Sequence, residues 1–319
     1  MRALTIHEYG PPDVFKLEDI EQPKPGNYQV LVEVKSSSIN PVDWKIRAGH
    51  LSLIIPKHWP RVLGVDCAGV VAEVGSAVRT FAPGDTVFGM SNPLRTPFGS
   101  YAHYCICEKD SLAKMPEGLS FEDAASLPVA ALTAYKALKQ QIKLQSGQTI
   151  LINGASGGVG SFAVQIARSM GAKIVATSGA DNIEFVKELG ADDVIDYRAQ
   201  DVAKLTQKFD GIFDASAKLN FRVASKMLNK HGVYVTTVPD AYTILGMLTS
   251  PFSRQKAHIV SAGSGAFVSQ ELSAIAELVL SGQVKPIIAQ SISLDKVPEF
   301  QKVSEEGHAR GKTVIKMFE

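Results

Sequence analysis

A glycine-rich stretch between residues 149 and 171 constrains the fold of this chain more than any other feature. It reads "TILINGASGGVGSFAVQIARSMG": a β-branched run, then a segment rich in glycine, then an amphipathic run that ends at Gly171. The apolar positions of that last run have the spacing of one helical face, and they are Val159, Ala163, Ile166 and Met170. A strand followed at once by glycines and a helix predicts a turn that binds phosphate, because the first N–H groups of the helix are unpaired and carry partial positive charge.

The loop itself predicts contact with the two phosphates of a dinucleotide. Gly157 would let the backbone approach the pyrophosphate, and Gly160 would let helix and strand pack closely. The usual G-x-G-x-x-G pattern is altered at its first position, where Ala155 follows Gly154. The alternative is a tight turn without a ligand, which the strand, loop, helix and second strand disfavour. The residues expected to bind the cofactor here are Ser156, Gly157, Gly158, Val159 and Gly160.

An uncharged residue stands where a dinucleotide site often has an acid. The second strand, "KIVATSG", ends at Ser178, whereas a carboxylate there would bind the ribose hydroxyls of NAD and repel a 2′-phosphate. Thr177, Ser178 and Gly179 would instead accept a 2′-phosphate, so the sequence favours NADPH over NADH. Arg198, after Tyr197 in "VIDYR", is the candidate cation for that phosphate. The same arginine could equally be a solvated surface residue.

Two different patterns of predicted secondary structure along the chain indicate two domains, as the length of 319 residues also suggests. Residues 1–122 contain short β-branched runs between turn signals such as "PKPGN" and "APGD". From 123 to 263 strands alternate with helices, starting with a helix that opens at Ser120, and this alternation predicts an α/β domain with a parallel sheet. Residues 264–319 begin with an apolar-periodic helix and return to short strands and turns. The simplest arrangement inserts a nucleotide domain into a β-rich domain built from both ends of the chain.

Composition excludes several classes of protein. The formal net charge of +1 gives no sign of the strongly basic character that is typical of nucleic-acid-binding proteins. No run of 18 apolar residues exists, and charged residues interrupt the N-terminal segment, so we expect a soluble cytoplasmic protein without a membrane-spanning segment. Cys67, Cys105 and Cys107 are too few for a disulfide framework and lack a zinc-knuckle spacing, and we interpret them as small buried hydrophobic residues.

Several motifs resemble one known family along the whole chain. "GQTILINGASGGVGSFAVQIAR" is similar to the quinone oxidoreductase and zeta-crystallin signature, and "GVDCAGVVAEVGSAV" resembles the medium-chain dehydrogenases/reductases. "INPVDWKIRAG" and "GHARGKTVI" look closest to enone and alkenal oxidoreductases and to chloroplast-envelope quinone oxidoreductase homologues. The resemblance implies a GroES-like β-rich catalytic domain and a Rossmann domain with a doubly wound parallel sheet. It also implies a homodimer formed by edge pairing of the Rossmann sheets.

The resemblance implies an enzyme that works without zinc. In the zinc-dependent relatives a cysteine ligand falls at Asn40, and a His-Glu pair falls at Val65 and Asp66. Zinc prefers thiolate and imidazole ligands, which Asn40 and Val65 lack, so no metal site is predicted. The expected activity is NADPH-dependent reduction of a quinone, or of the C=C bond of an α,β-unsaturated carbonyl compound. A dinucleotide-binding sensor or crystallin-like protein with little catalysis is the alternative.

The same resemblance assigns roles to further residues. Lys45 is expected to give electrostatic help and Asn40 to orient the substrate, while Asp43 is either part of the catalytic group or a cap for the following turn. Lys45 could also be an ordinary solvated lysine on a helix. The family places three residues near the nicotinamide and its carboxamide: Thr133, Val238 and Ser261. His308 and Asn182 stand where relatives carry an arginine and a lysine, so the adenosine end is less cationic here.

One further pattern is rejected. Tyr135 and Lys139 match the Tyr-x-x-x-Lys pair of short-chain dehydrogenases, but in those proteins the pair follows the phosphate loop, whereas here it precedes the loop. A coincidence on an amphipathic helix explains it.

Overall fold

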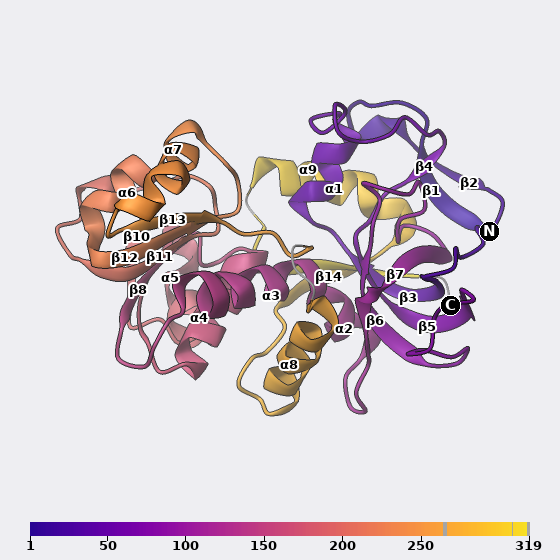
Figure 1. Ribbon diagram of the computed structural model, residues 1–319. Coiled ribbons are helices and arrows are strands. Elements are labelled where there is room, and N and C mark those ends of the chain that lie inside the picture. Colours follow the sequence, from indigo (N-terminus) through magenta and orange to yellow (C-terminus); the bar gives the residue numbers. More distant parts are fainter. Residues whose placement is uncertain (264–266, 308, 318–319) are drawn as a thin grey trace. The chain divides into compact units, whose positions relative to one another are not determined.

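The computed structural model describes residues 1–263, 267–307 and 309–317 of the chain (Figure 1). The chain forms two compact units. The first contains Met1–Val129, Gly265–Leu280 and Ile288–Glu319, and the second contains Ala130–Ser264 and Ser281–Ile287. Each unit is described by itself.

The second unit is built on a six-stranded parallel sheet. Its strands lie in the order β10-β9-β8-β11-β12-β13. Their bounds are β8 Thr149–Asn153, β9 Lys173–Ser178, β10 Asp193–Asp196, β11 Phe209–Asp214, β12 Leu228–Thr236 and β13 Lys256–Ile259. The strands that follow β8 in the sequence first add to one side of it, as β9 and β10, and then to its other side, as β11, β12 and β13. The crevice between the carboxyl ends of β8 and β11 is therefore the topological switch point, where such sheets bind ligands. The predicted parallel α/β fold is confirmed.

Helices cover both faces of this sheet. The helices α4 (Gly158–Ser169) and α5 (Ile183–Glu188) lie on one face, and α6 (Phe221–Met227) and α7 (Ala241–Thr249) lie on the other (Figure 1). Short 3-10 turns connect them at Ala180–Asn182, Val202–Lys204 and Ser250–Phe252. Buried apolar side chains such as Leu151, Ile212 and Tyr234 fill the layer on the α6 side. Burial of this kind provides most of the stability of amphipathic helices.

The first unit is a β-barrel with additional strands. The strand β3 (Gln29–Ser38) pairs with both β5 (Asp66–Val74) and β7 (Tyr104–Lys114), and β6 (Thr86–Ser91) lies between those two, which closes the barrel. The strands β15 (Lys312–Lys316) and β14 (Ile288–Ser293) extend the sheet from β3. A small sheet packs beside it, with β1 Arg2–Ile6, β2 Phe15–Asp19 and β4 Arg61–Val62. The strand β3 buries Val30, Val32 and Val34 on one face, and Leu31 on the other face is buried as well.

The helix predicted from Ser120 onward exists, but it is divided. The helix α2 (Phe121–Ser126) begins as predicted, because the Ser120 hydroxyl accepts a hydrogen bond from the Asp123 N–H at 3.0 Å. Pro128 then interrupts the helix, since proline has no N–H and restricts the residue before it. The helix α3 (Pro128–Tyr135) follows, and a wider π-helical segment, Lys136–Ile142, ends at the left-handed Lys143.

Three more helices complete the first unit. They are α1 (Pro41–Arg47), α8 (Val268–Leu280) and α9 (Val297–Glu306), with short 3-10 turns at Pro12–Val14 and Leu294–Lys296. The helix α9 lies in the tail for which only strands and turns were predicted, so that prediction was wrong there. Pro298 stands in its first turn and the left-handed Gly307 follows its last residue, which are ordinary start and stop signals.

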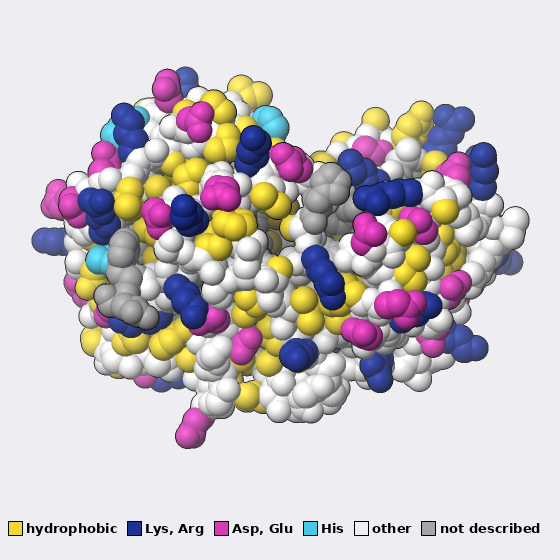
Figure 2. Space-filling view, turned by 180° about the vertical axis from the view of Figure 1, so that it is seen from behind, with side chains coloured by type: hydrophobic (Ala, Val, Ile, Leu, Met, Phe, Trp, Pro, Cys, Tyr) yellow, Lys and Arg dark blue, Asp and Glu magenta, His cyan; other side chains and the backbone are white. Residues whose placement is uncertain are grey.

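The surface carries mixed charge. On the face shown in Figure 2, basic and acidic side chains are interspersed and no large area has one sign. Among the described residues, no helix combines the length and apolar character needed to cross a membrane.

Candidate functional site

The glycine-rich loop is anchored at the carboxyl ends of three neighbouring strands. The Thr177 hydroxyl, on β9, accepts a hydrogen bond from Gly154 N–H at 3.0 Å and donates one to Asn153 Oδ1 at 2.6 Å. Asn153 Nδ2 in turn donates to Asp214 Oδ1, at the end of β11, and to Ser216 Oγ, each at 2.8 Å. This network fixes where the loop leaves the sheet before any ligand binds.

The individual glycines of the loop have different roles. Gly154 has φ of +82°, a conformation that side chains rarely adopt. A Cβ on Gly160 would lie 2.1 Å from the carbonyl oxygen of Gly154, so helix–strand packing itself requires glycine there. A Cβ on Gly157 would meet only that same oxygen at 3.7 Å. Packing does not require glycine at position 157, and the open space at the N-terminus of α4 fits a phosphate group.

The residues predicted for the ribose end come together beside the loop. Ser178 ends β9 and pairs with Asp196 at the end of β10, which brings Arg198 next to it. The guanidinium carbon of Arg198 lies 3.4 Å from where a Cβ of Gly179 would be. Arg198 also lies over the Tyr197 ring, with 5.7 Å between guanidinium carbon and ring centroid, and pairs at 3.8 Å with the exposed Asp181. Asn182 lies in the short turn directly after Gly179.

The other predicted cofactor residues have different positions. Val238 and Ser261 follow the ends of β12 and β13, which are neighbours in the sheet, so both lie at the same edge as the loop. Thr133 is buried on α3. His308 lies outside the described residues, and its predicted contact with phosphate is not tested.

In the first unit, the predicted catalytic residue Asn40 and three other residues donate hydrogen bonds to a buried carboxylate. Asp66, at the start of β5, is 0% exposed. Its Oδ2 accepts hydrogen bonds from Ser38 Oγ at 2.5 Å, from Asn40 Nδ2 at 2.7 Å and from Lys312 Nζ at 3.3 Å. Its Oδ1 accepts the Val129 N–H, in the first turn of α3, at 2.8 Å. We call these residues, with Asp66 at the centre, the Asp66 cluster.

The Asp66 cluster determines the orientation of Asn40. The Lys312 ammonium donates to Asn40 Oδ1 at 2.6 Å and to the Ile39 carbonyl at 3.1 Å. Since Asn40 Oδ1 accepts from a cation and its Nδ2 donates to a carboxylate, the amide has one orientation only. Asn40 and Val65 are the positions where zinc-dependent relatives are expected to hold metal ligands. Here Asn40 Oδ1 and the Oδ2 of Asp66, the residue after Val65, accept hydrogen bonds from an ammonium group of the same chain.

Asp43 lies beside this cluster as a second buried carboxyl. Its Oδ2 accepts the Asn40 N–H at 2.8 Å and the Tyr101 hydroxyl at 2.9 Å, while its Oδ1 has no hydrogen-bond partner within the described chain. Burial raises the pKa of Asp43 to about 7, although these two hydrogen bonds oppose the change. The contact with Asn40 N–H caps the first turn of α1, so the capping role considered from the sequence is present.

Lys45 is the predicted catalytic residue that the Asp66 cluster does not bind. It lies on α1 and is half-buried, with its Nζ 5.6 Å from the centroid of the Trp44 ring. Burial lowers the pKa of Lys45. A partly dehydrated ammonium group interacts more strongly with developing negative charge than a solvated one does.

Sequence reasoning missed residues that position the site. Lys312, Ser38 and Tyr101 were not predicted to contact Asn40 or Asp43, and Asn153 and Asp214 were not predicted to hold the glycine loop. A signal existed for Asn153 and Asp214, because each is the polar last residue of a largely buried strand. No local signal existed for Lys312, which is 246 residues from Asp66.

Comparison with known proteins finds relatives along the whole chain. Residues 26–117 match the family described as "Alcohol dehydrogenase GroES-like domain", and residues 189–315 match that described as "Zinc-binding dehydrogenase". The chain is 33% identical to the chloroplastic quinone-oxidoreductase QR1 of Triphysaria versicolor, over 99% of this chain and 98% of that protein. It is 34% identical to the chloroplastic NADPH-dependent alkenal/one oxidoreductase of Arabidopsis thaliana, over 99% of this chain and 79% of that protein. The structure of Escherichia coli quinone oxidoreductase complexed with NADPH aligns with a TM-score of 0.85 at 25% identity, over 99% of this chain and 100% of that chain.

Substituting alanine for the two loop glycines should have different effects. Gly157→Ala should leave the thermal midpoint unchanged but weaken NADPH binding by about tenfold or more, because the methyl group enters the space for phosphate. Gly160→Ala should lower the free energy of unfolding by about 1–3 kcal/mol, because its methyl group overlaps backbone atoms. Thermal unfolding and nucleotide fluorescence titration distinguish the two. Equal NADPH affinity of Gly157→Ala and the natural protein would show that position 157 does not face the phosphates.

Removing Lys312 should destabilise the first unit. In the Lys312→Met variant the buried Asp66 loses its cation. Such a loss typically lowers the free energy of unfolding by about 3–5 kcal/mol. The double variant Asp66→Asn/Lys312→Met removes both charges and should recover a large part of that loss. Both tryptophans, Trp44 and Trp59, belong to the first unit, so their fluorescence during urea unfolding reports on it. A single variant as stable as the natural protein would contradict the central role of this pair.

Proposed function

Because the chain belongs to the zinc-free quinone oxidoreductase family of the medium-chain dehydrogenases/reductases, we propose that it reduces quinones or the C=C bond of α,β-unsaturated carbonyl compounds with NADPH. The observation that carries this proposal is the joint presence of an open phosphate loop and an Asp66 cluster in which Asn40, at the expected position of a zinc ligand in zinc-dependent relatives, accepts a hydrogen bond from an ammonium group.

The chemistry of these substrates matches what the chain's own residues supply. When bound, NADPH supplies a hydride. The negative charge that develops on the substrate is delocalised over an enolate or a quinol anion, so hydrogen bonds and one nearby cation stabilise it. Lys45 is the proposed cation, and the remaining amide hydrogen of Asn40 is the proposed donor that orients the carbonyl oxygen. The Asp66 cluster holds Asn40 in place, since its Nδ2 donates to Asp66 and its Oδ1 accepts from Lys312.

NADPH is the proposed cofactor on the evidence of the ribose end. No carboxylate occupies position 178, and Arg198 lies against the backbone of Gly179. The Thr177 hydroxyl is already used to anchor the loop. The 2′-phosphate contacts are therefore assigned to Ser178, to the backbone of Gly179 and to Arg198, with the ring of Tyr197 supporting the guanidinium group.

Turnover with a substrate panel tests the proposed reaction. Purified protein should oxidise NADPH in the presence of a short enone or 9,10-phenanthrenequinone, and hardly with a simple saturated aldehyde. Lys45→Ala should lower kcat by about tenfold or more while changing NADPH affinity little, because its ammonium acts on charge that develops during the reaction. Turnover of the aldehyde alone would contradict the proposal. Tight NADPH binding without turnover of any substrate would favour a sensor.

Arg198→Ala should weaken NADPH binding by roughly 10–100-fold, the expected loss for a charge-assisted hydrogen bond to phosphate. NADH has no 2′-phosphate, so its affinity should stay within about twofold of that of the natural protein. Fluorescence titration with both nucleotides measures this. Arg222→Ala is a matched control, because Arg222 also lies over a tyrosine ring, that of Tyr242, but on α6, which covers the opposite face of the sheet from α4 (Figure 1). Equal losses for NADPH and NADH would place Arg198 outside the phosphate site.

A homodimer is the proposed assembly, formed through the second unit. The strand β13 is an edge strand, and its outer side has no partner strand in the described chain. The adjoining segment exposes large apolar side chains, including Leu248, 71% exposed, and Phe252, 95% exposed. A second copy that pairs β13 with β13 would cover these residues and the open sheet edge together.

The oligomeric state tests this assembly. The natural protein should elute as a dimer in size-exclusion chromatography with light scattering, and Leu248→Glu should shift it toward the monomer. Leu53→Glu replaces a fully exposed leucine of the first unit and should leave the dimer intact. A natural protein that is monomeric at micromolar concentration would exclude the proposed interface.

A further inference from the structure

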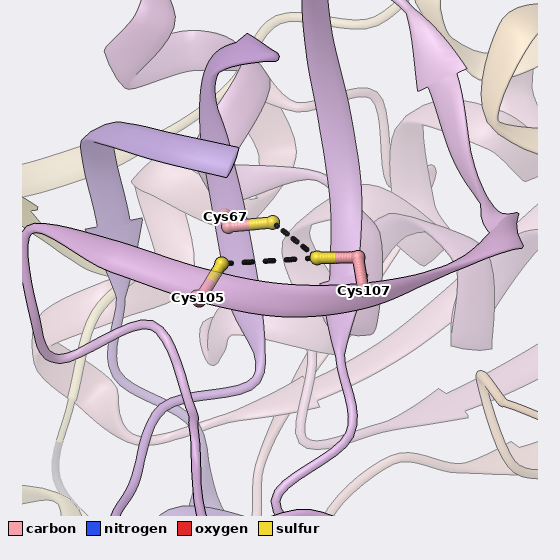
Figure 3. A group of neighbouring side chains, drawn as sticks. All are labelled: Cys67, Cys105 and Cys107. Carbon is pink, nitrogen blue, oxygen red and sulfur yellow. Dashed lines mark hydrogen bonds between the residues drawn. The ribbon is translucent and has the colours of Figure 1, made fainter. Parts of the chain in front are cut away.

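All three cysteines of the chain meet inside the β-barrel of the first unit. Cys67 lies on β5, and Cys105 and Cys107 lie on the same face of β7 (Figure 3). The strands β5 and β7 each pair with both β3 and β6. The sulfur of Cys107 is 3.5 Å from that of Cys67 and 3.7 Å from that of Cys105. All three sulfurs lie within 4.8 Å of one another.

Three sulfurs at these distances match the geometry of a shared central atom. An atom that holds three sulfurs at about 2.3 Å keeps them roughly 3.4 Å apart at the compressed angles of a pyramidal centre with a lone pair, and roughly 3.8 Å apart at tetrahedral angles. The two measured separations lie within that range. The side chains already point toward one another, so a ligand would need only small rotations of the thiols.

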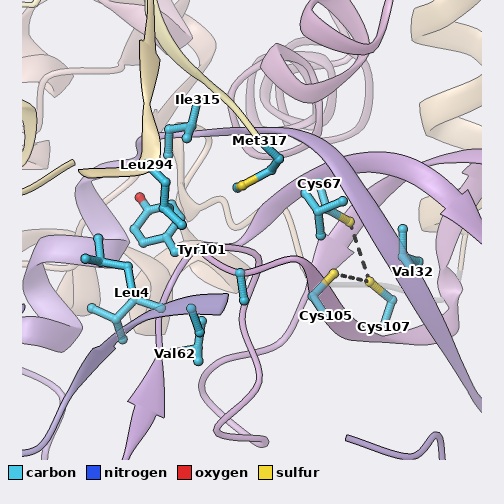
Figure 4. Packing of buried hydrophobic residues seen from close by; sticks show 14 of the residues in the cluster. Leu4, Val32, Val62, Cys67, Tyr101, Cys105, Cys107, Leu294, Ile315 and Met317 are labelled. Atoms are coloured by element: carbon cyan, nitrogen blue, oxygen red, sulfur yellow. Dashed lines mark hydrogen bonds between the residues drawn. The ribbon is translucent and has the colours of Figure 1, made fainter. Parts of the chain in front are cut away.

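The surroundings of the sulfurs are apolar. The three cysteines are fully buried and belong to a core cluster that also contains Val32, Leu4 and Met317 (Figure 4). Asp66 precedes Cys67 on β5, so its side chain points to the opposite face of the strand. Hydrogen bonds with Cys105 and Cys107 lower the pKa of the Cys67 thiol to about 5, whereas hydrogen bonds with Cys105 and Cys67, together with burial, raise the pKa of the Cys107 thiol. The core cluster around the sulfurs consists of apolar side chains, among which an uncompensated charge is costly. The cluster therefore favours ligands that leave no net charge in the core.

Charge decides between the candidate ligands. Zinc bound by three thiolates would leave one negative charge and a fourth coordination position without a protein ligand. A monovalent soft ion such as Cu(I) would leave two negative charges with three thiolates. Trivalent arsenic bound by three thiolates is neutral, and its lone pair occupies the fourth position. An uncompensated charge in this core would cost several kcal/mol, roughly, whereas the neutral complex does not incur that cost.

We propose that Cys67, Cys105 and Cys107 form a binding site for one trivalent arsenic atom, taken up from arsenous acid. Three S–As bonds form and three As–O bonds break. Each thiol proton leaves with one hydroxide as water, so three water molecules are released and no group is oxidised or reduced. The site is independent of the proposed nucleotide chemistry, since all its residues lie in the barrel of the first unit.

Arsenite binding to the native protein tests the site. After incubation with sodium arsenite and desalting, native mass spectrometry should show one arsenic atom per chain, with the mass of three hydrogens lost. The chain has no other cysteine, so the stoichiometry reports on this cluster alone. Each single variant, Cys67→Ala, Cys105→Ala and Cys107→Ala, should retain at least about tenfold less arsenic, because a third bond is lost. The triple alanine variant should retain none.

Two further results decide the matter where a variant folds poorly. Arsenite should raise the thermal midpoint of the natural protein, because a ligand that binds the native state stabilises it. Zinc chloride at the same concentration should not. Arsenic bound only after unfolding, a single variant that binds as tightly as the natural protein, or a larger shift with zinc would each overturn the proposal.

Discussion

The buried carboxylate of Asp66 is the interaction on which the first unit depends. A charge removed from water needs a partner and several hydrogen bonds, and the chain supplies them from distant segments. Ser38 and Asn40 come from the end of β3, the Val129 N–H comes from α3, and Lys312 comes from β15. Because the only cation of this group lies near the C-terminal end, the barrel can satisfy Asp66 only when both ends of the chain are folded together. This gives a physical reason why the nucleotide-binding unit is inserted between them.

The second unit holds its glycine loop by the same principle. Asp214 is fully buried at the end of β11, and its oxygens accept bonds from Asn153, Ser216 and the Leu219 N–H. Asn153 then binds Thr177, which receives the first N–H of the loop. In both units a buried acid fixes the residues that face a ligand. The proposed binding groups are therefore already positioned, and less conformational entropy is lost when a ligand binds.

The sequence allowed the parallel sheet, its strands and the phosphate loop to be predicted, because each depends on local patterns of hydrophobicity and glycine. It did not reveal α9, although Pro298 and Gly307 mark its ends, because the helix is largely polar and its apolar stripe is narrow. The division of the helix after Ser126 followed from Pro128, whose effect was underestimated. The contacts of Lys312 could not have been predicted locally, since they depend on which strands become neighbours. The cysteines were correctly predicted to be buried, but their mutual contact arises only when the barrel closes.

The Asp66 cluster also limits the reactions that this family member can support. A divalent metal ion polarises a carbonyl group strongly because it keeps an open coordination position for the substrate. The Lys312 ammonium has no such freedom, since Ile39, Asn40 and Asp66 receive its hydrogen bonds. The proposed help, from the ammonium group of Lys45 and one amide hydrogen of Asn40, suits substrates whose negative charge is spread over several atoms. Quinones and enones meet that condition, whereas the alkoxide formed from a simple aldehyde concentrates its charge on one oxygen and would need stronger stabilisation than one ammonium group and one amide hydrogen supply.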